Sequence, residues 1–284
     1  MSCPSFGDLG KEAKDVYRSG FHLGLVNFSI TSILKNINIG GNLKHNLDEN
    51  LSSGVGFIGF ESENFGKTIG KYTNGGVFSL QYFLKKNLFE NVDINGIFSY
   101  NTESSESSLQ VNSNYTTDNF HGNLSLTNCF ELNSRATVDV VYRIKDIFVG
   151  YQTGFDTASN KFTRNDLGLG FAVNDMGFHF RCNSIPTEFG LSVHRKVANN
   201  WDVAMNGIFA KKGDSQFWTL GIGAKYELSD GAIFRCKVDK DQQIGISFCQ
   251  RLLDMLNFTV SCNIDGANLD SGGHKAGISI ELEA

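Results

Sequence analysis

The sequence predicts an all-β fold, a transmembrane β-barrel of about 19 strands that follows a short N-terminal α-helix. Apolar and polar residues alternate along most of the chain, which is the pattern of strands with one apolar face. The 284 residues include 31 Gly and 24 Phe but only 2 Pro, and this suits many strands joined by tight turns, because proline cannot donate to a strand ladder. No run approaches the ~18 apolar residues of a membrane helix, so a helical membrane protein is excluded.

The first predicted element is a short amphipathic helix over residues 5–18. Leu9, Ala13 and Val16 recur at the spacing i, i+4, i+7, and charged residues fill much of the rest of the helical wheel. No later part of the sequence shows a sustained helical period. We therefore expect one helix that packs through one apolar face.

A flexible joint is expected after the helix, because Gly20 and Gly24 bracket three residues and glycine adopts backbone conformations that other residues avoid. Beyond this hinge, no linker, low-complexity block or charge run marks a domain boundary. The sequence therefore predicts two regions. Residues 1–24 form the amphipathic helix and glycine hinge, and residues 25–284 form the transmembrane β-barrel.

Alternation then repeats in strand-length segments separated by turn residues. The clearest segments are 26–31, 92–100, 138–142, 167–173, 189–193, 218–228, 244–248, 256–264 and 274–282. Turn clusters lie at 73–76, 212–214 and 265–268. Strands of roughly ten residues suit a tilted crossing of a bilayer, whereas strands of soluble sheets usually have about five or six. With roughly four residues per turn, the chain beyond the helix accommodates about 19 strands.

Aromatic residues often fall near the ends of these segments, where a barrel would place them at the two membrane interfaces. Examples are Tyr142, Trp201, Trp218 and Tyr226. The alternating signal is weak for each single strand, so a large soluble β-sandwich or β-helix stays open as an alternative.

Residues that could carry chemistry are scattered. The six cysteines form no CxxC pair and the six histidines no HxxxH pair, so we expect no metal site and no cofactor. No carboxylate pair or nucleophile arrangement stands out, which indicates that the protein is not an enzyme. The letters GxGxxG at Gly54, Gly56 and Gly59 lack the flanking strand and helix of a dinucleotide site. The N-terminus has no apolar signal segment, so secretory export is not expected.

Four stretches carry a resemblance to a known family. They are FGDLGKEAKDVYRSGFHLGL near the start, GYQTGFDTASNKFTRNDLGLGF at 150–171, TEFGLSVHRKV at 187–197, and the tail over 237–284. They resemble the mitochondrial porins, or voltage-dependent anion channels, in register from end to end. The resemblance implies nineteen strands, a count known for that family, with the helix inside the pore. With an odd number the first and last strands run parallel, so residues 273–282 would pair with 26–34 and close the cylinder.

The resemblance also implies roles for particular residues. Lumen charge would come from the helix residues Lys11, Lys14 and Arg18, with Gly20 and Gly24 as the hinge. Contacts to a nicotinamide nucleotide would come from Lys11, Gln243, Ile244, Gly245, Ser261, Cys262, Asn263, Ile264 and Asp265. The closing strand would carry the sorting pattern of mitochondrial outer-membrane barrels, at Lys275, Gly277, Ile278, Ile280 and Leu282.

Some positions depart from the family pattern. His22 stands where family members usually carry a hinge glycine, which predicts a stiffer hinge. Ser19 replaces a basic residue of the helix, and Arg18 beside it is expected to substitute. Gly70 stands where many members have a membrane-facing glutamate, so functions tied to that carboxylate lose their support. Polar residues replace aliphatic ones at Gln243 and Asn263, so nucleotide contact is expected to be weak.

Together these observations predict a voltage-gated diffusion channel of the mitochondrial outer membrane for ions and small metabolites, including nucleotides. Membrane lipid would surround it, nucleic acid is not an expected partner, and association into a homo-oligomer is left open. The net charge of −5 predicts weaker anion selectivity than in typical members, or even a preference for cations. Two alternatives remain: a protein-conducting outer-membrane barrel and a soluble β-rich binding protein.

Overall fold

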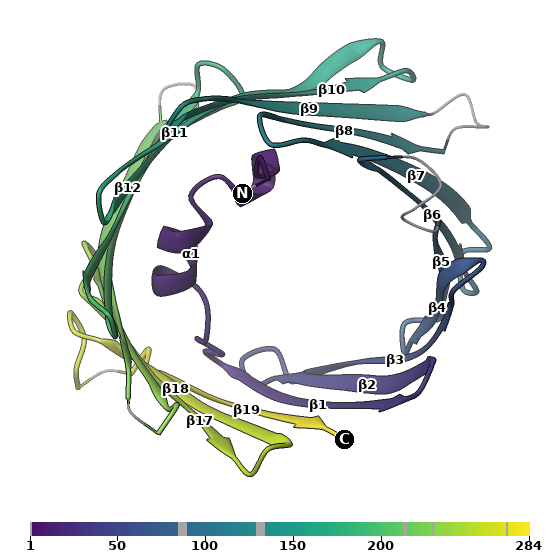
Figure 1. The fold of residues 1–284 in the computed structure, drawn as a ribbon. Helices are drawn as coiled ribbons and strands as arrows, with labels where there is room; N and C mark the ends of the chain where they lie inside the picture. Colours follow the sequence, from purple (N-terminus) through teal and green to yellow (C-terminus); the bar gives the residue numbers. More distant parts are fainter. Residues whose placement is uncertain (1, 85–89, 129–133, 213–214, 229, 271) are drawn as a thin grey trace.

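A computed structural model describes residues 2–84, 90–128, 134–212, 215–228, 230–270 and 272–284. Within these residues nineteen strands form one closed barrel with the N-terminal segment inside it, which confirms the predicted fold class (Figure 1). The elements are η1 (Phe6–Asp8), α1 (Lys11–Tyr17), β1 (Leu25–Leu34), β2 (Ile37–Asn46), β3 (Leu51–Ser62), β4 (Gly66–Thr73), β5 (Val77–Phe83), β6 (Val92–Asn101), β7 (Ser107–Thr116), β8 (Phe120–Thr127), β9 (Arg135–Ile144), β10 (Ile147–Asp156), β11 (Lys161–Val173), β12 (Met176–Asn183), β13 (Glu188–Ala198), β14 (Trp201–Lys212), β15 (Ser215–Glu227), β16 (Ile233–Asp239), β17 (Gln243–Leu252), β18 (Leu256–Asp265) and β19 (Lys275–Glu283).

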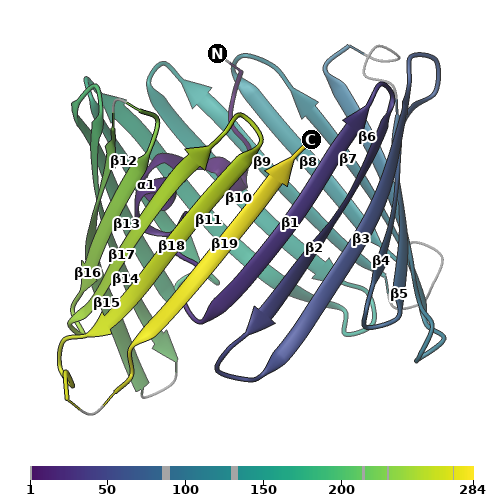
Figure 2. The ribbon, with the colours of Figure 1, turned by 90° about the horizontal axis from the view of Figure 1, so that it is seen from below.

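The cylinder closes between the first and the last strand (Figure 2). β1 pairs with β19 in parallel, from Val26 opposite Ile278 to Thr31 opposite Glu283. The ladder continues to the last residue, since the N–H of Ala284 donates to the carbonyl of Thr31 at 2.8 Å. The parallel pairing predicted for the closing strand is therefore confirmed. It removes the sheet edge, whose unpaired backbone groups would be costly in lipid.

Alternating side chains give the wall an apolar outer face and a polar inner face. Large apolar residues such as Ile58, Phe98 and Leu220 are exposed on the outside, as expected for side chains that meet lipid. On the inside, the amide of Asn27 donates to Ser279 Oγ at 2.8 Å across the closing pair. The same alternation that the sequence shows thus separates the two environments of the wall.

The N-terminal helix differs from its prediction, because one continuous helix over 5–18 is wrong. The segment contains the short turn η1 and the seven-residue α1, separated at Gly10, whose φ of +71° interrupts the helix. A side chain at this position would also meet His179 on β12, with its Cβ 2.6 Å from Nδ1. The predicted apolar face is confirmed, since Leu9, Ala13 and Val16 are all buried. Within the described residues, no helix is long and apolar enough to cross a membrane.

The predicted turns that the structure describes fall between strands. Residues 74–76 connect β4 to β5, and the connection after β18 begins at Gly266. Residues 213–214 of the third predicted turn lie outside the described residues.

A first prediction concerns the closing strand. Ile280 and Leu282 have the outward parity and lie opposite Phe28 and Ile30 of β1, so lysines there would enter lipid. We expect the double variant Ile280→Lys, Leu282→Lys to lose barrel stability, at about 2–4 kcal/mol for each lysine near the bilayer midplane. Urea-dependent folding of purified protein into lipid vesicles measures this.

The matched control is Ser29→Lys on β1, which has the inward parity and lies opposite Glu281. It is expected to fold almost as well as the unchanged protein. Equal folding of the double variant and the control would show that these two positions do not face lipid.

Candidate functional site: the lumen and the docked N-terminal segment

The inner face of the wall carries both signs of charge, with slightly more basic than acidic residues. The basic residues described at inward strand positions are Lys44, Lys67, Lys71, Arg135, Arg143, Lys161, Arg164, Arg181, Lys196, Lys225, Arg235, Lys237, Arg251 and Lys275. The acidic ones are Glu61, Asp93, Asp139, Asp156, Asp166, Glu188, Asp202, Glu227, Asp239, Asp265, Glu281 and Glu283. Among described strand residues, Arg195 and Lys211 have the outward parity. Charge therefore gathers on the inner face, because ions facing lipid are costly.

The acidic excess of the chain lies in the connections between strands, at the two mouths of the barrel. The described acidic residues there are Asp48, Glu49, Glu63, Glu90, Glu103, Glu106, Asp118, Asp146, Asp175, Asp230, Asp241, Asp254 and Asp270, against the basic residues Lys35, Lys145 and Lys240. The net charge of −5 consequently reports the mouths more than the lumen.

Apolar side chains anchor the N-terminal segment along one side of the lumen. Phe6 and Leu9 form a buried cluster with Cys3 and Val141, and Phe148 of β10 packs against it. Ala13 and Val16 form a second cluster with Ala204 of β14. The segment therefore lies against β9–β16 instead of crossing the middle of the pore (Figure 1).

Glycines on the inner face let the segment approach the wall closely. A Cβ at Gly150 would lie 2.8 Å from the Phe6 ring, and one at Gly168 would lie 3.0 Å from Leu9. A methyl group at Gly221 would overlap the Tyr17 hydroxyl, and one at Gly277 would overlap the backbone carbonyl of His22. These glycines thus leave space on the inner face of the wall, and the residues of the docked segment occupy that space.

The hinge is held to the wall by hydrogen bonds and is not free. Ser247 Oγ donates to the carbonyl of Gly20 at 2.6 Å, and the N–H of His22 donates to Ser261 Oγ at 3.0 Å. The N–H of Gly24 donates to the carbonyl of Ala276 at 3.0 Å. Both hinge glycines have positive φ, which few other residues tolerate.

Phe21, beside His22, holds the hinge through its ring. Lys237 Nζ lies 4.1 Å from the centroid of the Phe21 ring and 5.3 Å from that of Tyr17, which is cation–π geometry. Burial lowers the pKa of the His22 imidazole, so the docked hinge favours its neutral form. The residue that replaces the usual glycine is thus accommodated by the wall.

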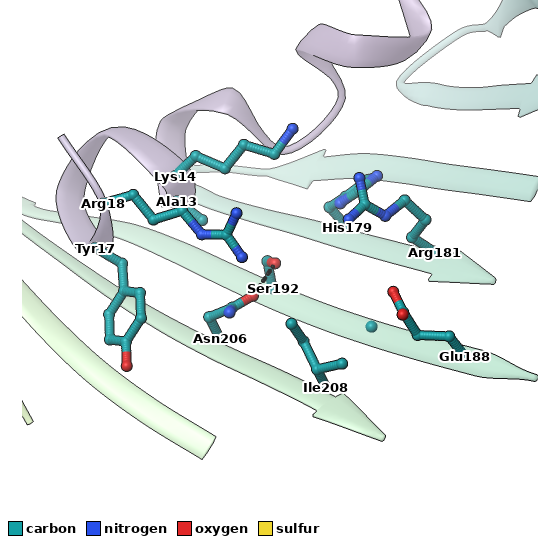
Figure 3. A pocket seen from close by; sticks show the side chains of 11 residues that line it. Ala13, Lys14, Tyr17, Arg18, His179, Arg181, Glu188, Ser192, Asn206 and Ile208 are labelled. Carbon is teal, nitrogen blue, oxygen red and sulfur yellow. Dashed lines mark hydrogen bonds between the residues drawn. The ribbon is translucent and has the colours of Figure 1, made fainter. Parts of the chain in front are cut away.

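The predicted basic residues of the helix take different positions. Lys11 is 75% exposed and forms an ion pair with Asp8 at 3.6 Å. Lys14 Nζ donates to the carbonyl of Gly7 at 2.9 Å, and Lys14 and Arg18 both line a cavity between α1 and the wall (Figure 3). Lys14 is therefore half-buried between α1 and the wall, whereas Lys11 and Arg18 are exposed to the lumen.

The predicted nucleotide contacts lie on both faces of β17 and β18. The two segments are brought together, with Gln243 opposite Asp265 and Gly245 opposite Asn263. The parity is inward for Gln243, Gly245, Ser261, Asn263 and Asp265, and outward for Ile244, Cys262 and Ile264. No described contact joins Lys11 to this group.

Two of the inward residues are already covered. Ser261 is 1% exposed and bonds to the hinge, and a Cβ at Gly245 would lie 3.2 Å from the Phe21 ring. Asn263 Nδ2 donates to Gln243 Oε1 at 2.5 Å, which leaves a small polar group beside Asp265. A solute in the lumen can therefore contact the amides of Gln243 and Asn263 and the carboxylate of Asp265.

The closing strand and β4 place the remaining predicted residues. Lys275 forms an ion pair with Asp48, Gly277 lies under the hinge, and Ile278, Ile280 and Leu282 have the outward parity. Gly70 faces outward between Ile58 and Leu80. The outer face thus carries no carboxylate at this position.

Sequence reasoning missed the wall residues that hold the segment. These residues are His179, Ser247, Lys237 and His194. The His194 ring lies between two carboxylates, with Nδ1 3.4 Å from Glu12 Oε2 on α1 and Nε2 3.4 Å from Asp202 Oδ1 on β14. The alternation of the sequence predicts that these side chains face inward, but their partners in the N-terminal segment are far away in sequence. Among the described residues no group of three or more His, Cys, Asp or Glu could hold a metal ion, and Cys129 lies outside them.

A closed ladder, an apolar exterior and a charged interior define a pore-forming membrane barrel. Residues 2–277 match the eukaryotic porin family model, and the chain belongs to that family. It is a family of channels and not of enzymes, so the protein is a porin-type channel of the outer-membrane barrel class. The protein-conducting alternative is not favoured by this match.

Relatives cover nearly the whole chain. The human "Non-selective voltage-gated ion channel VDAC2" is 28% identical over 284 residues, which span 99% of this chain and 95% of that protein. The Drosophila melanogaster "Voltage-dependent anion-selective channel" is 30% identical over 306 aligned positions, with both chains covered completely. The Meleagris gallopavo protein named like the human one is 28% identical, over 99% of this chain and 94% of its own.

A second prediction tests the docking of the hinge on the closing strand. Gly277→Ala would place a methyl group against the backbone carbonyl of His22, which cannot swing away like a side chain. We expect the hydrogen bonds from the N–H groups of His22 and Gly24 to be lost. Their amide exchange should become at least about fivefold faster, as for one hydrogen bond worth ~1 kcal/mol. Hydrogen exchange of the refolded protein measures this.

Gly96→Ala on the outer face is the control, since a Cβ there meets nothing within 4 Å. Its hinge exchange should match that of the unchanged protein. Unaltered exchange in Gly277→Ala would mean that the hinge does not rest on β19.

Proposed function

We propose that the protein is a voltage-gated diffusion channel of the mitochondrial outer membrane that passes ions and small metabolites with weak ion selectivity. The observation that carries this proposal is the arrangement of the lumen. Charges of both signs line its wall, and the N-terminal segment is docked along one side of it. The names of the relatives in human and Drosophila support the voltage dependence.

Conduction would rest on weak, distributed attraction. Basic residues such as Arg235, Lys237 and Lys225 lie on neighbouring strands, and several acidic side chains lie close to basic ones. Lys225 pairs with Glu227 at 2.7 Å, and Arg164 with Asp166 at 2.6 Å. Charges that are already paired in this way hold a passing ion only weakly, which is what passage requires.

Weak selectivity follows from the distribution of charge. The nearly balanced wall gives little net field, and the acidic mouths favour cations at the entrances. The docked segment adds Lys11, Lys14 and Arg18 but also the acidic residues Asp8, Glu12 and Asp15, so it changes this balance little. We therefore propose that anion selectivity is weaker than the names of some relatives would suggest, and that a small cation preference is compatible with it.

The same balance bears on gating. Moving one elementary charge across the membrane potential is worth about 2.3 kcal/mol per 100 mV, so a gate must move net charge. The three basic and three acidic residues of the segment cancel when it moves as a unit. We infer that the voltage-sensing charge resides in the wall, and that the segment and its hinge act as the part that responds.

Nucleotides would pass as weakly held solutes. The inward residues left open at the β17–β18 pair are Gln243, Asn263 and Asp265, and their one charge is negative. A carboxylate repels phosphate, so only the two amides would assist a nucleotide there. The closing strand, with Lys275 and Gly277 before three outward aliphatic residues, supports the mitochondrial assignment.

A third prediction tests the channel itself. Purified protein refolded in detergent and added to a planar bilayer should give stepwise conductance that falls partly at high voltage of either sign. The reason is the open, charged lumen beside the docked segment. A detergent blank is the control. Protein that stays monodisperse without detergent and gives no steps would contradict the proposal and favour a soluble binding protein.

A fourth prediction concerns the acidic mouths. In a KCl gradient the unchanged channel should show a reversal potential near zero. Glu49, Glu103 and Glu106 lie in connections after even-numbered strands, hence at one end of the barrel. Changing all three to Gln should shift the reversal potential toward that of chloride. The permeability ratio should change by about twofold or less, because salt screens fixed charge over about 8 Å.

Changing the same three residues to Asp keeps the charge and is the matched control. Its reversal potential should equal that of the unchanged channel. A strong chloride preference in the unchanged channel would place the acidic mouths outside the conduction path and overturn the proposed weak selectivity.

A further inference from the structure

A small cavity lies between α1 and the wall strands β12, β13 and β14 (Figure 3). Its volume is about 30 Å³. Cationic side chains line it from both sides, Lys14 and Arg18 from the docked segment and Arg181 from β12, and the imidazole of His179 on β12 lines it as well. The polar residues Ser192 and Asn206 form part of its floor. The cavity is therefore a place where two elements bring like charges together.

The positive charge in this cavity is poorly compensated. No ion pair within the described residues involves Arg18, Arg181 or Lys14. The carboxylate that lines the cavity, that of Glu188, accepts a hydrogen bond from Asn183 Nδ2 at 2.5 Å. Burial lowers the pKa of Lys14, and its neighbours Arg181 and Arg18 lower it further, while the carboxylate of Asp8 opposes this shift in part.

Hydrogen-bond donors in the cavity also lack partners. His179 is only 7% exposed, and its buried Nε2 has no hydrogen-bond partner within the described residues. Its Nδ1 lies toward Gly10 of the docked segment. A buried imidazole nitrogen without a partner is costly, and two guanidinium groups beside it offer further N–H donors. Among the residues that line the cavity, Glu188 is the acceptor with negative charge, and no described hydrogen bond or ion pair joins it to these donors.

We propose that this cavity binds one small inorganic anion, of chloride to phosphate size, which links α1 to β12. A volume of about 30 Å³ holds roughly two waters, or one ion of this size, but not a nucleoside. Arg18 and Arg181 would donate from opposite sides, and His179 would donate from the tautomer protonated at Nε2. Ser192 Oγ donates to Asn206 Oδ1 at 2.9 Å, which turns the amide N–H groups of Asn206 toward other acceptors.

The consequence is a bridge between the docked segment and the wall. Apolar contacts to Ala204 hold the face of α1 that carries Ala13 and Val16. Beside the cavity, in contrast, Lys14 and Arg18 of the docked segment meet Arg181 of the wall, which has the same charge. A bound anion converts that repulsion into attraction from both sides. This inference does not depend on the selectivity of the pore, because it concerns binding at equilibrium.

The test uses the full chain, refolded in a zwitterionic detergent and kept at constant ionic strength with sodium gluconate. Isothermal titration calorimetry with sodium phosphate, and separately with sodium chloride, should show one saturable site per chain for at least one of the two anions. Arg181→Gln and Arg18→Gln should each weaken binding at least tenfold. If one variant fails to fold, the other carries the test, since their residues lie on different elements.

Lys71→Gln is the matched control. Lys71 has the inward parity on β4 but does not line the cavity, so the variant should bind within twofold of the unchanged protein. Binding of the preferred anion should also slow amide exchange of Val16 and Tyr17 relative to gluconate alone.

Several results would overturn the proposal. One is the absence of saturable anion binding, and another is an unchanged anion affinity in Arg181→Gln. A third is a loss of affinity in Lys71→Gln as large as that in Arg181→Gln, because this would indicate only the general electrostatic field of the lumen. ATP that binds more tightly than phosphate and depends on Arg181 would assign the cavity to nucleotides instead. Unchanged amide exchange of Val16 and Tyr17 on anion binding would show that the anion does not link α1 to β12. Failure of any kind here leaves bilayer conductance unaffected, so the two proposals are separable.

Discussion

The need to satisfy every backbone polar group in lipid is the constraint on which the rest of this structure depends. A sheet with an open edge would leave unpaired N–H and C=O groups in hydrocarbon. The parallel pairing of β1 with β19 removes that edge and extends to Ala284. Once the cylinder is closed, each strand position faces either lipid or water, and the alternation of residues acquires its meaning.

Closure also determines how the N-terminal segment is held. The hinge enters the barrel at the start of β1, directly beside the strand that closes it. The N–H of Gly24 bonds to Ala276, and the carbonyl of His22 rests on Gly277, both on β19 or at its start. The pairing that seals the wall therefore also fixes the point from which α1 runs along the lumen. A change at the closing pair is felt by the wall and by the docked segment.

Electrostatics follow the same division of space. Charged side chains avoid lipid and gather on the inner face or in the connections. The inner face is nearly balanced, whereas the connections are acidic, and the two together give the chain its net charge of −5. A single number for the whole chain thus combines two environments that act on a passing ion in different ways. The cavity beside Arg181 differs again, because there the basic residues meet with little compensation.

The sequence by itself determined the all-β class, the strand-length alternation, the apolar face of the helix through Leu9, Ala13 and Val16, and, through resemblance, the closing pair. These are local properties, since parity and period depend on neighbouring residues. The tertiary structure decided the break at Gly10, the covering of Ser261 by the hinge, and the positions of Lys14 and Arg18. Those outcomes depend on which wall residues come to face the segment, and strands more than a hundred residues away in sequence supply them. Only closure of the barrel brings His179 and Ser247 to the docked segment, and no local pattern encodes that meeting.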